Sequence, residues 1–407
     1  MKTVDVFLDT KIDLFGIEVR VIDVLFFSVL LGLGLSMRIG LFEYESGDYI
    51  SFLEVWIREC RNAGGFPYLG IEPGITDKST INYGCMYQYV IILAYYFSGI
   101  MKEHYFLKLI SVTFDVICAV SVMRIAYLVT ESDRKKAIMA FGAMMFLPTS
   151  VLNSGAWAQC DSIYTAFVLL SLLHLMKGNN KRLFIYLALA YSFKQQAIFI
   201  VPFLIIMWLK GRVKLRYIYW IPVVLVATDI PALIAGRDPI RLLKIYSSQV
   251  VTYTKLTMNY PSIYTVVSSQ LARDYRKLII SVGTMAAVAL LGAIAYYIRD
   301  KKYEINGINM VTLVIFTVEV CLFTLPVMHE RYGYLPEILS VVYAVTGYKR
   351  MVVCAVLQMI SLVTYSKFLF GSTVGELWPL TIGLFAIIVV VGKDLYLQVN
   401  AQETEHA

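Results

Sequence analysis

Charge is scarce in this sequence. Only 16% of its 407 residues are charged, 58% are hydrophobic, and the mean hydropathy is +0.68. Soluble globular domains carry about 25% charged residues, so the composition excludes that class. Apolar stretches of about 15–24 residues recur from residue 21 to residue 396, and helices of that length cross a bilayer. We therefore predict an all-α polytopic membrane protein, folded as a single integral-membrane domain over residues 1–407.

Metal-type cysteine patterns, cleavage signals and internal repeats are also missing. The six cysteines show no metal-ligand spacing, and those inside apolar stretches are expected to pack as small hydrophobic residues. Cys60 and Cys85 could lie on the same side of the membrane and could form a disulfide. The N-terminal region is acidic and has no small-residue cleavage site after a short apolar core, so we expect no removable signal peptide. The two halves lack the paired broken helices that mark inverted-repeat transporters.

The basic residues between the apolar stretches predict a topology. The thirteen stretches are 21–41, 84–101, 105–128, 137–151, 162–176, 183–193, 197–210, 216–236, 277–298, 306–327, 333–346, 350–370 and 375–393. Strict alternation from a cytoplasmic N-terminus would place five tight basic clusters outside, against the positive-inside rule. If one early stretch does not cross, all five lie in the cytoplasm. This predicts a bundle of about 12 transmembrane helices with both termini cytoplasmic. The net charge of +7 is thus a topology signal, and we expect no nucleic-acid partner.

The stretch at residues 84–101 is the best candidate for the segment that does not cross. It is rich in tyrosine and bounded by glycines, as expected of an interfacial or re-entrant helix, and whether it spans stays open. It lies in a first long outer loop, residues 42–104. A second long outer loop, residues 237–276, carries many lysines and arginines. This charge favours attraction to an anion or to lipid headgroups, or an amphipathic helix lying on the bilayer.

Asp48 stands in the first outer loop, within the run EYESGDYISFLEVWI that begins at Glu43. Apolar residues recur at helical spacing after it, which predicts a short amphipathic helix that ends near residues 62–65. Asp48 lies at or near the N-cap of that helix, and aspartate is a preferred N-cap residue. A carboxylate at the membrane surface could instead do chemistry. The two roles are compatible, since a capping carboxylate can still present an oxygen to a cleft.

Three later polar turns fall on the same predicted face as Asp48. In residues 152–167 the chain turns with polar residues, and Asp161 starts the next span, where an N-cap role is the simpler interpretation. Lys194 lies in a minimal turn and needs an anionic partner, either a lipid phosphate or a carboxylate on a neighbouring span. The turn at residues 328–334 holds an acid, a base and a cation that could bind phosphate and sugar hydroxyls, or could be a solvated turn.

Together these turns describe a site at the outer membrane surface for a substrate that is part lipid and part polar. The residues predicted to bind substrate are Glu45, Tyr49, Trp157, Gln159, Asp161, Lys194, Gln195, Gln196, His329, Glu330 and Arg331. Asp115 and Glu319 lie near the middle of spans, so each must be paired, protonated or facing a cavity. Structural hydrogen bonding explains those two acids as well as function does.

These residues resemble motifs of the GT-C superfamily of polytopic glycosyltransferases, and more closely the bacterial relatives of GPI-anchor mannosyltransferases. The shared elements, in order, are Gly-Asp-Tyr before a helix, the W-x-Q-C-D-S-I-Y-T-A-F run, the F-K-x-Q-A-I-F turn and the late H-E-R-Y turn. The resemblance spans residues 20 to about 345. A more distant resemblance is to the dolichyl-phosphate-glucose-dependent glucosyltransferases. Relatives often carry a proline pair where this chain has Asn82-Tyr83-Gly84.

The resemblance implies an enzyme of the plasma membrane with its active site on the extracytoplasmic face. A polyprenyl-phosphate-linked donor would supply a hexose, mannose or glucose, to a glycan or glycolipid acceptor in the outer leaflet. Asp48 would be the general base, Lys194 and Arg331 would neutralise the leaving phosphate, and the anomeric carbon would be inverted. No Asp-x-Asp motif lies in the outer loops, so we predict no metal and no cofactor. The alternatives are a transporter or flippase of lipid-linked sugars, or a non-catalytic scaffold.

Overall fold

The computed structural model describes residues 5, 7–71, 83–248, 255–299, 301 and 304–405. The chain is 76% helical and all-α apart from two short strand pairs, as predicted. Its helices are α2 (Val21–Ile39), α3 (Glu54–Asn62), α4 (Cys85–Tyr96), α5 (Glu103–Val129), α6 (Arg134–Met145), α7 (Pro148–Val151), α8 (Asp161–Met176), α9 (Asn180–Phe193), α10 (Val201–Leu209), α11 (Trp220–Ile234), α12 (Pro239–Ser248), α13 (Ser269–Asp274), α14 (Arg276–Arg299), α15 (Gly307–Thr324), α16 (Tyr334–Ala344), α17 (Tyr348–Leu369) and α18 (Leu377–Glu405).

Shorter elements connect these helices. Two π-helical turns are η1 (Tyr49–Leu53) and η3 (Leu152–Ala156). The 3₁₀ turns are η2 (Phe66–Gly70), η4 (Gln195–Ile200), η5 (Leu215–Tyr217) and η7 (Ile263–Val266). The strands are β1 (Lys11–Leu14), β2 (Ile17–Arg20), β3 (Thr257–Met258) and β4 (Met328–His329).

Seven helices of the described chain are long and apolar enough to cross a bilayer. They are α2, α5, Leu215–Ile234, α14, α15, α17 and Leu377–Ala401. The pair Arg134–Met145 and Pro148–Ala156, bent by 46°, makes an eighth if it is one broken span. By length and composition the chain is therefore a multi-pass membrane protein. The predicted count of about 12 is not confirmed, because α8, η4 with α10, and α16 are apolar but only 10–17 residues long, fewer than the roughly 20 residues of a typical transmembrane helix.

The helix α4 occupies most of the stretch predicted not to cross. Its 12 residues cover about 18 Å along the helix axis, less than the hydrocarbon core of about 30 Å. It packs against α3, α5, α9 and α11. This length fits the prediction of an interfacial or re-entrant helix, which stays a prediction.

Burial separates interior helices from peripheral ones. The apolar windows of α15 and α5 are 78% and 61% buried, whereas those of α11 and α14 are each only 11% buried. Such continuous apolar surface is not tolerated in water by a monomeric soluble protein, and it fits contact with lipid. The main core gathers residues of α5, α6, α8, α15 and α16, and a second apolar cluster lies under α3 and α4.

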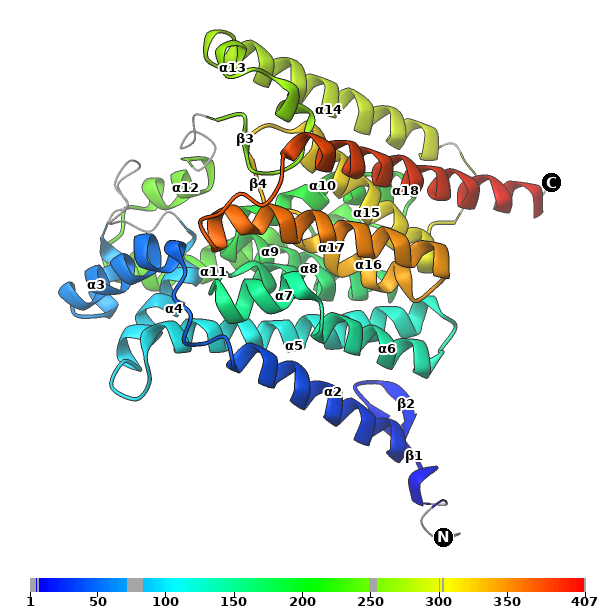
Figure 1. Cartoon of the computed structure of the whole chain (residues 1–407), viewed down its shortest axis with the longest axis horizontal. Helices are drawn as coiled ribbons and strands as arrows, with labels where there is room; N and C mark the ends of the chain where they lie inside the picture. The colour runs from blue at the N-terminus through cyan, green and yellow to red at the C-terminus, as the bar shows by residue number, and fades with distance from the viewer. Residues whose placement is uncertain are drawn as a thin grey trace.

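The two ends of the bundle differ. In Figure 1 the first residues and the end of α18 lie on one side, while α3, α4 and α12 lie on the other. The direction of α5 agrees with this arrangement. Glu103, the first residue of α5, pairs with Arg61 of α3, so α5 starts beside α3 and runs away from it. The basic starts of α6 and α9 therefore lie at the end that also holds both termini.

Two strand pairs were not predicted. β1 and β2 form a hairpin whose turn residues Phe15 and Gly16 both have positive φ, as a type I′ turn requires. β3 pairs in parallel with β4, which brings residues 257–258 of the second long loop beside the turn at 328–334. Two-residue strands leave no periodicity to detect in a sequence.

The second long loop is only in part the amphipathic surface that was predicted. α12 buries Leu242 and Ile245 and exposes Leu243, as an interfacial helix would. Arg237, however, is not available to lipid headgroups. It is buried, and its guanidinium donates to the carbonyl of Leu69 at 2.7 Å and to Gln88 Oε1 at 3.1 Å.

Candidate functional site

The four polar turns meet at one end of the bundle. Asp48 comes from the chain entering η1, Trp157 and Gln159 follow η3, and Asp161 is the first residue of α8. Lys194 joins α9 to η4, and Arg331 lies between β4 and α16. Residues separated by up to 283 positions (331 minus 48) thus form one cluster, as their common face predicted.

Asp48 is not the cap of its helix. Its side chain makes no capping hydrogen bond, and Ser46 does that work instead. The Oγ of Ser46 accepts from the Tyr49 amide at 3.1 Å and donates to the Trp157 carbonyl at 3.2 Å. Asp48 thus lies at the predicted N-cap position of η1 without capping it, and its carboxylate is left free to face the cluster.

The Asp48 carboxylate is held through one oxygen. Its Oδ2 accepts from Trp157 Nε1 and from Gln159 Nε2, each at 3.0 Å, and lies 3.7 Å from Arg331 Nη1. Within the described residues Oδ1 has no hydrogen-bond partner, and the side chain is 22% exposed. The group is therefore oriented by the protein while one oxygen stays open.

Asp161 and Lys194 form a buried ion pair. Lys194 Nζ donates to Asp161 Oδ1, and both side chains are almost fully shielded from solvent. The other carboxylate oxygen accepts from Asn153 Nδ2 at 3.0 Å. Of the two partners proposed for Lys194, the structure has the carboxylate on a neighbouring helix. Asp161 is the first helical residue of α8, Cys160 is at the N-cap, and no side chain makes a capping hydrogen bond there. The N-cap interpretation of Asp161 was therefore wrong.

Arg331 links the acids of the cluster. Its Nη1 donates to Glu330 Oε1 at 2.7 Å, its Nε lies 3.7 Å from Asp161 Oδ2, and its guanidinium sits 5.5 Å from the centre of the Trp157 ring. Burial alone would lower the pKa of Arg331, but Glu330, Asp48 and Asp161 outweigh it and the pKa rises well above its ordinary value. The cluster thus contains a permanent, largely buried cation.

Glu330 is held as a carboxylate beside that cation. Burial works to raise the pKa of Glu330, but Arg331 and His329 outweigh it, and the pKa lies below its ordinary value. His329 Nδ1 is 3.6 Å from Glu330 Oε2. Parallel pairing of β3 with β4 fixes the backbone that carries both residues.

Irregular backbone gathers around the cluster. Both π turns adjoin it, and π turns inside helices occur frequently at functional sites. Ala158, between Trp157 and Gln159, has φ +60°, and Val327, just before β4, has φ +64°. Positive φ is uncommon for non-glycine residues and is an outlier for a β-branched one. This concentration supports a functional role for the cluster.

Four predicted residues lie apart from the cluster. Glu45 is half exposed and lies 3.3 Å from His104 Nδ1, and Tyr49 is buried with its ring against His104. The Gln195 side chain donates to the Ile245 carbonyl at 3.0 Å, which ties η4 to α12. Gln196 is buried, and among the described residues it makes no hydrogen bond or ion pair with Asp48, Asp161 or Arg331.

Sequence reasoning missed two contributors. Ser46 could have been found, because serine followed by Gly-Asp before an apolar period is an N-cap signal. Tyr83 could not have been found: it lies far from Lys194 in sequence, yet its ring centre is 6.0 Å from the Lys194 ammonium.

A second buried hydrogen-bond network contacts η3 from the interior of the bundle. Of the three possibilities for a mid-span acid, Asp115 is paired. Its Oδ2 accepts from Arg38 Nε at 2.6 Å and from Ser154 at 2.5 Å, and its Oδ1 accepts from Tyr334 at 3.0 Å. Glu319 accepts from Tyr260 at 3.0 Å. The mid-span acid Asp115 therefore holds helices together, and it does so at the turn that presents Trp157.

No group of three or more histidine, cysteine or acidic side chains is placed to hold a metal ion in the described part of the chain. All six cysteines are free thiols, Cys60 and Cys85 included. The chain matches no protein-family model and no curated protein. The chemistry of the cluster must therefore be argued from its own geometry.

Proposed function

We propose that this chain is an integral-membrane glycosyltransferase of the GT-C type. It transfers a hexose, mannose or glucose, from a polyprenyl-phosphate-linked donor to a glycan or glycolipid acceptor. The observation that carries the proposal is the Asp48 carboxylate: two N–H donors orient one oxygen, the other oxygen is open, and the Arg331 cation lies 3.7 Å away.

In this proposal Asp48 is the general base. Its open oxygen takes the proton of the acceptor hydroxyl as that oxygen bonds to the anomeric carbon. The bond from the anomeric carbon to the phosphate oxygen breaks on the opposite face, so the product is inverted. Polyprenyl phosphate leaves with the bonding electrons, and its added negative charge is stabilised by Arg331.

Lys194 has a different role from the one that the resemblance implied. It is more deeply buried than Arg331 and is already paired with Asp161. We therefore assign the leaving phosphate to Arg331 and treat Lys194 as a positioning residue. The pair fixes Asp161, whose other oxygen lies 3.7 Å from Arg331 and helps to place the guanidinium.

The proposed topology follows the run of the helices. Counting α8, α9, η4 with α10, and α16 as crossings beside the eight longer spans gives twelve, with α4 left at the surface. Both termini and the basic turns then lie in the cytoplasm, as the positive-inside rule requires. The cluster at the opposite end faces the extracytoplasmic side of the plasma membrane.

The transporter alternative is less well supported. A transport path needs polar groups free to bind cargo through the bundle. Asp115 and Glu319, the mid-span acids that prompted the idea, each accept hydrogen bonds from other side chains of the protein. An oriented, partly exposed carboxylate at one end of the bundle fits a surface enzyme better.

The test is Asp48→Asn in the whole chain, reconstituted in liposomes with polyprenyl-phosphate mannose or glucose that carries a radiolabelled hexose. Asparagine keeps the size and one accepting oxygen but is not a base. We expect hexose release or transfer to fall about 10²–10⁴-fold, with donor binding and thermal unfolding unchanged. Glu54→Gln, an exposed acid on α3, is the matched control. Full transfer by the Asn variant would refute the base role, and bilayer crossing of the lipid-linked sugar without hexose release would favour a transporter.

A further inference from the structure

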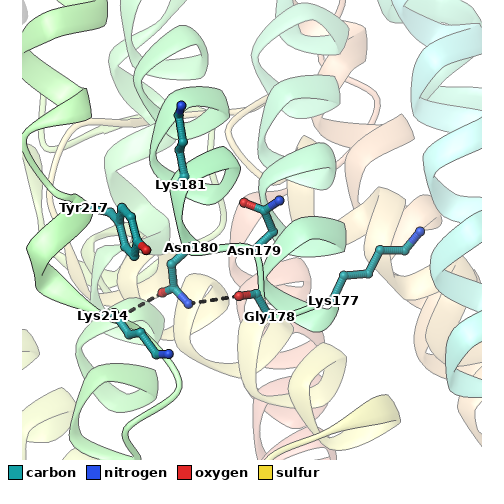
Figure 2. A pocket seen from close by; sticks show the side chains of 7 residues that line it. All are labelled: Lys177, Gly178, Asn179, Asn180, Lys181, Lys214 and Tyr217. Atoms are coloured by element: carbon teal, nitrogen blue, oxygen red, sulfur yellow. Dashed lines mark hydrogen bonds between the residues drawn. The ribbon is translucent and has the colours of Figure 1, made fainter.

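A hollow lies at the far end of α8, away from Asp161. Its lining comes from the end of α8 at residues 177–178, the start of α9 at residues 179–181, Lys214 and Tyr217 (Figure 2). None of these residues contributes to the cluster around Asp48. The hollow is therefore a separate feature at the end of the bundle that holds the basic turns.

A buried asparagine builds the floor of the hollow. Asn180 Nδ2 donates to the carbonyls of Gly178 at 3.4 Å and Arg212 at 3.3 Å, and Asn180 Oδ1 accepts from the Lys214 amide at 2.7 Å. These bonds join the turn before α9 to the turn before α11 (Figure 2). The backbone of the hollow is therefore held in place by a side chain that is only 4% exposed.

The hollow is positive and lacks counterions. Lys177, Lys181 and Lys214 line it, Arg182 follows Lys181 directly, and Arg212 stands two residues before Lys214. In the described part of the chain none of these five has a carboxylate within 4.0 Å. Burial, and to a lesser extent the nearby charge of Arg124, lower the pKa of Lys177. Bringing an anion here would relieve the mutual repulsion of these groups.

Aromatic residues place the hollow at headgroup depth. Tyr217 lines it, and the Lys181 ammonium lies 4.6 Å from the centre of the Trp220 ring. Trp220 begins α11, in which only Asp229 and Ala232 are fully buried. Tyrosine and tryptophan concentrate where a bilayer meets water. A ligand in the hollow can therefore keep its acyl chains beside α11.

We propose that this hollow binds a phosphate-bearing anion, the headgroup of an anionic phospholipid. Figure 2 shows the three lysines around Asn180 with their ammonium groups pointing in different directions. Because lysine has a flexible four-carbon stem, each ammonium can turn toward a headgroup bound in the hollow. Basic pockets of this kind between membrane helices bind lipid phosphates. The inference does not depend on the proposed glycosyl transfer.

The test counts bound lipid on the intact protein by native mass spectrometry in detergent. The probes are phosphatidylglycerol, neutral phosphatidylcholine and inorganic phosphate. The variant combines Lys177→Ala, Lys181→Ala and Lys214→Ala. Its control, Lys135→Ala with Lys136→Ala and Lys349→Ala, removes the same charge at the same end of the bundle, outside the hollow. Thermal unfolding of both variants checks that they fold.

We expect phosphatidylglycerol to bind the wild type and the control alike, and to bind the hollow variant about 100-fold more weakly, at about fivefold per lysine. Competition by millimolar inorganic phosphate at the same lysines would identify free phosphate as a second source of the same chemistry. Equal loss in both variants would show a diffuse charge effect and overturn the proposal. Equal binding of phosphatidylcholine, or no loss in the hollow variant, would overturn it as well.

Discussion

Replacing Lys194 with methionine tests whether the cluster is built on the buried Asp161–Lys194 pair. Methionine fills a similar volume without the charge, so Asp161 is left as a buried carboxylate without its main cation. Removing one member of a buried pair costs about 3–5 kcal/mol. Asn153 still donates to Asp161, and Arg331 remains 3.7 Å away. We therefore expect the lower end of that range, about 3 kcal/mol.

A double-mutant cycle separates this pair from other effects. Lys194→Met with Asp161→Asn removes both charges, so the double variant should be more stable than the sum of the single changes predicts, with a coupling of about 2 kcal/mol or more. The free energy of unfolding is measured by tryptophan fluorescence in mixed micelles of increasing denaturing detergent. Lys135→Met, at an exposed site on α6, should change it by less than about 0.5 kcal/mol.

Two outcomes would refute this reasoning. Zero coupling between Lys194 and Asp161 would show that the pair does not stabilise the fold. A Lys194→Met protein of wild-type stability that binds polyprenyl-phosphate sugar tenfold more weakly would show that Lys194 serves the donor phosphate. The structural pair predicts the reverse, lower stability with donor affinity retained in the folded fraction.

Two further predictions concern the groups around Asp48. Trp157→Phe deletes the Nε1 donor to Asp48 while keeping a ring beside Tyr365. A hydrogen bond to a charged group contributes about 1.5–3 kcal/mol, so transfer should slow about 10–100-fold. The control Trp208→Phe, on the exposed side of α10, should leave the rate unchanged, and an unchanged rate in Trp157→Phe would contradict the role of Trp157. Glu330→Gln tests pH dependence: because the folded-state pKa of Glu330 is depressed, its stabilisation is complete above the unfolded value of about 4.3 and is lost as pH falls through the folded value. Unfolding midpoints between pH 7 and pH 3.5 should therefore fall more steeply in wild type than in Glu330→Gln, and identical slopes would exclude the effect.

Topological reasoning located the candidate site, but local reasoning did not place every side chain in it. The positive-inside rule put Asp48, Asp161, Lys194 and Arg331 on one face, and the structure brings these four together. Asp48 lies at the predicted N-cap position, but Ser46 makes the capping hydrogen bond, because the sequence does not reveal where a helix starts to within two residues. Glu45 and Tyr49 were included by proximity to Asp48, yet they lie against His104.

The predicted span count of about 12 is not confirmed, because several of the apolar helices are short. The apolar stretch 333–346 contains the 11-residue helix α16, and almost every side chain of α16 is buried by neighbouring helices. An interior helix does not need to match the bilayer along its whole length, because protein rather than lipid surrounds it. Apolar content predicted α8 and α16 at nearly their observed bounds: the stretches 162–176 and 333–346 correspond to Asp161–Met176 and Tyr334–Ala344.

The orientation of Asp48 depends on a chain of contacts that begins in the bundle interior. The Arg38–Asp115 pair holds Ser154 of η3, and Gly155 lets η3 approach Arg38 so closely that a Cβ would lie 3.1 Å from its backbone. The π turn of η3 then presents Trp157 and Gln159 to one oxygen of Asp48. Ala158, which stands between these two residues, has φ +60°, and such a strained residue costs about 1–3 kcal/mol. A carboxylate that only capped a helix would not need this strain. The strained backbone that holds the hydrogen-bond donors of Asp48 lowers stability, and this is the physical reason to propose chemistry for the Asp48 carboxylate.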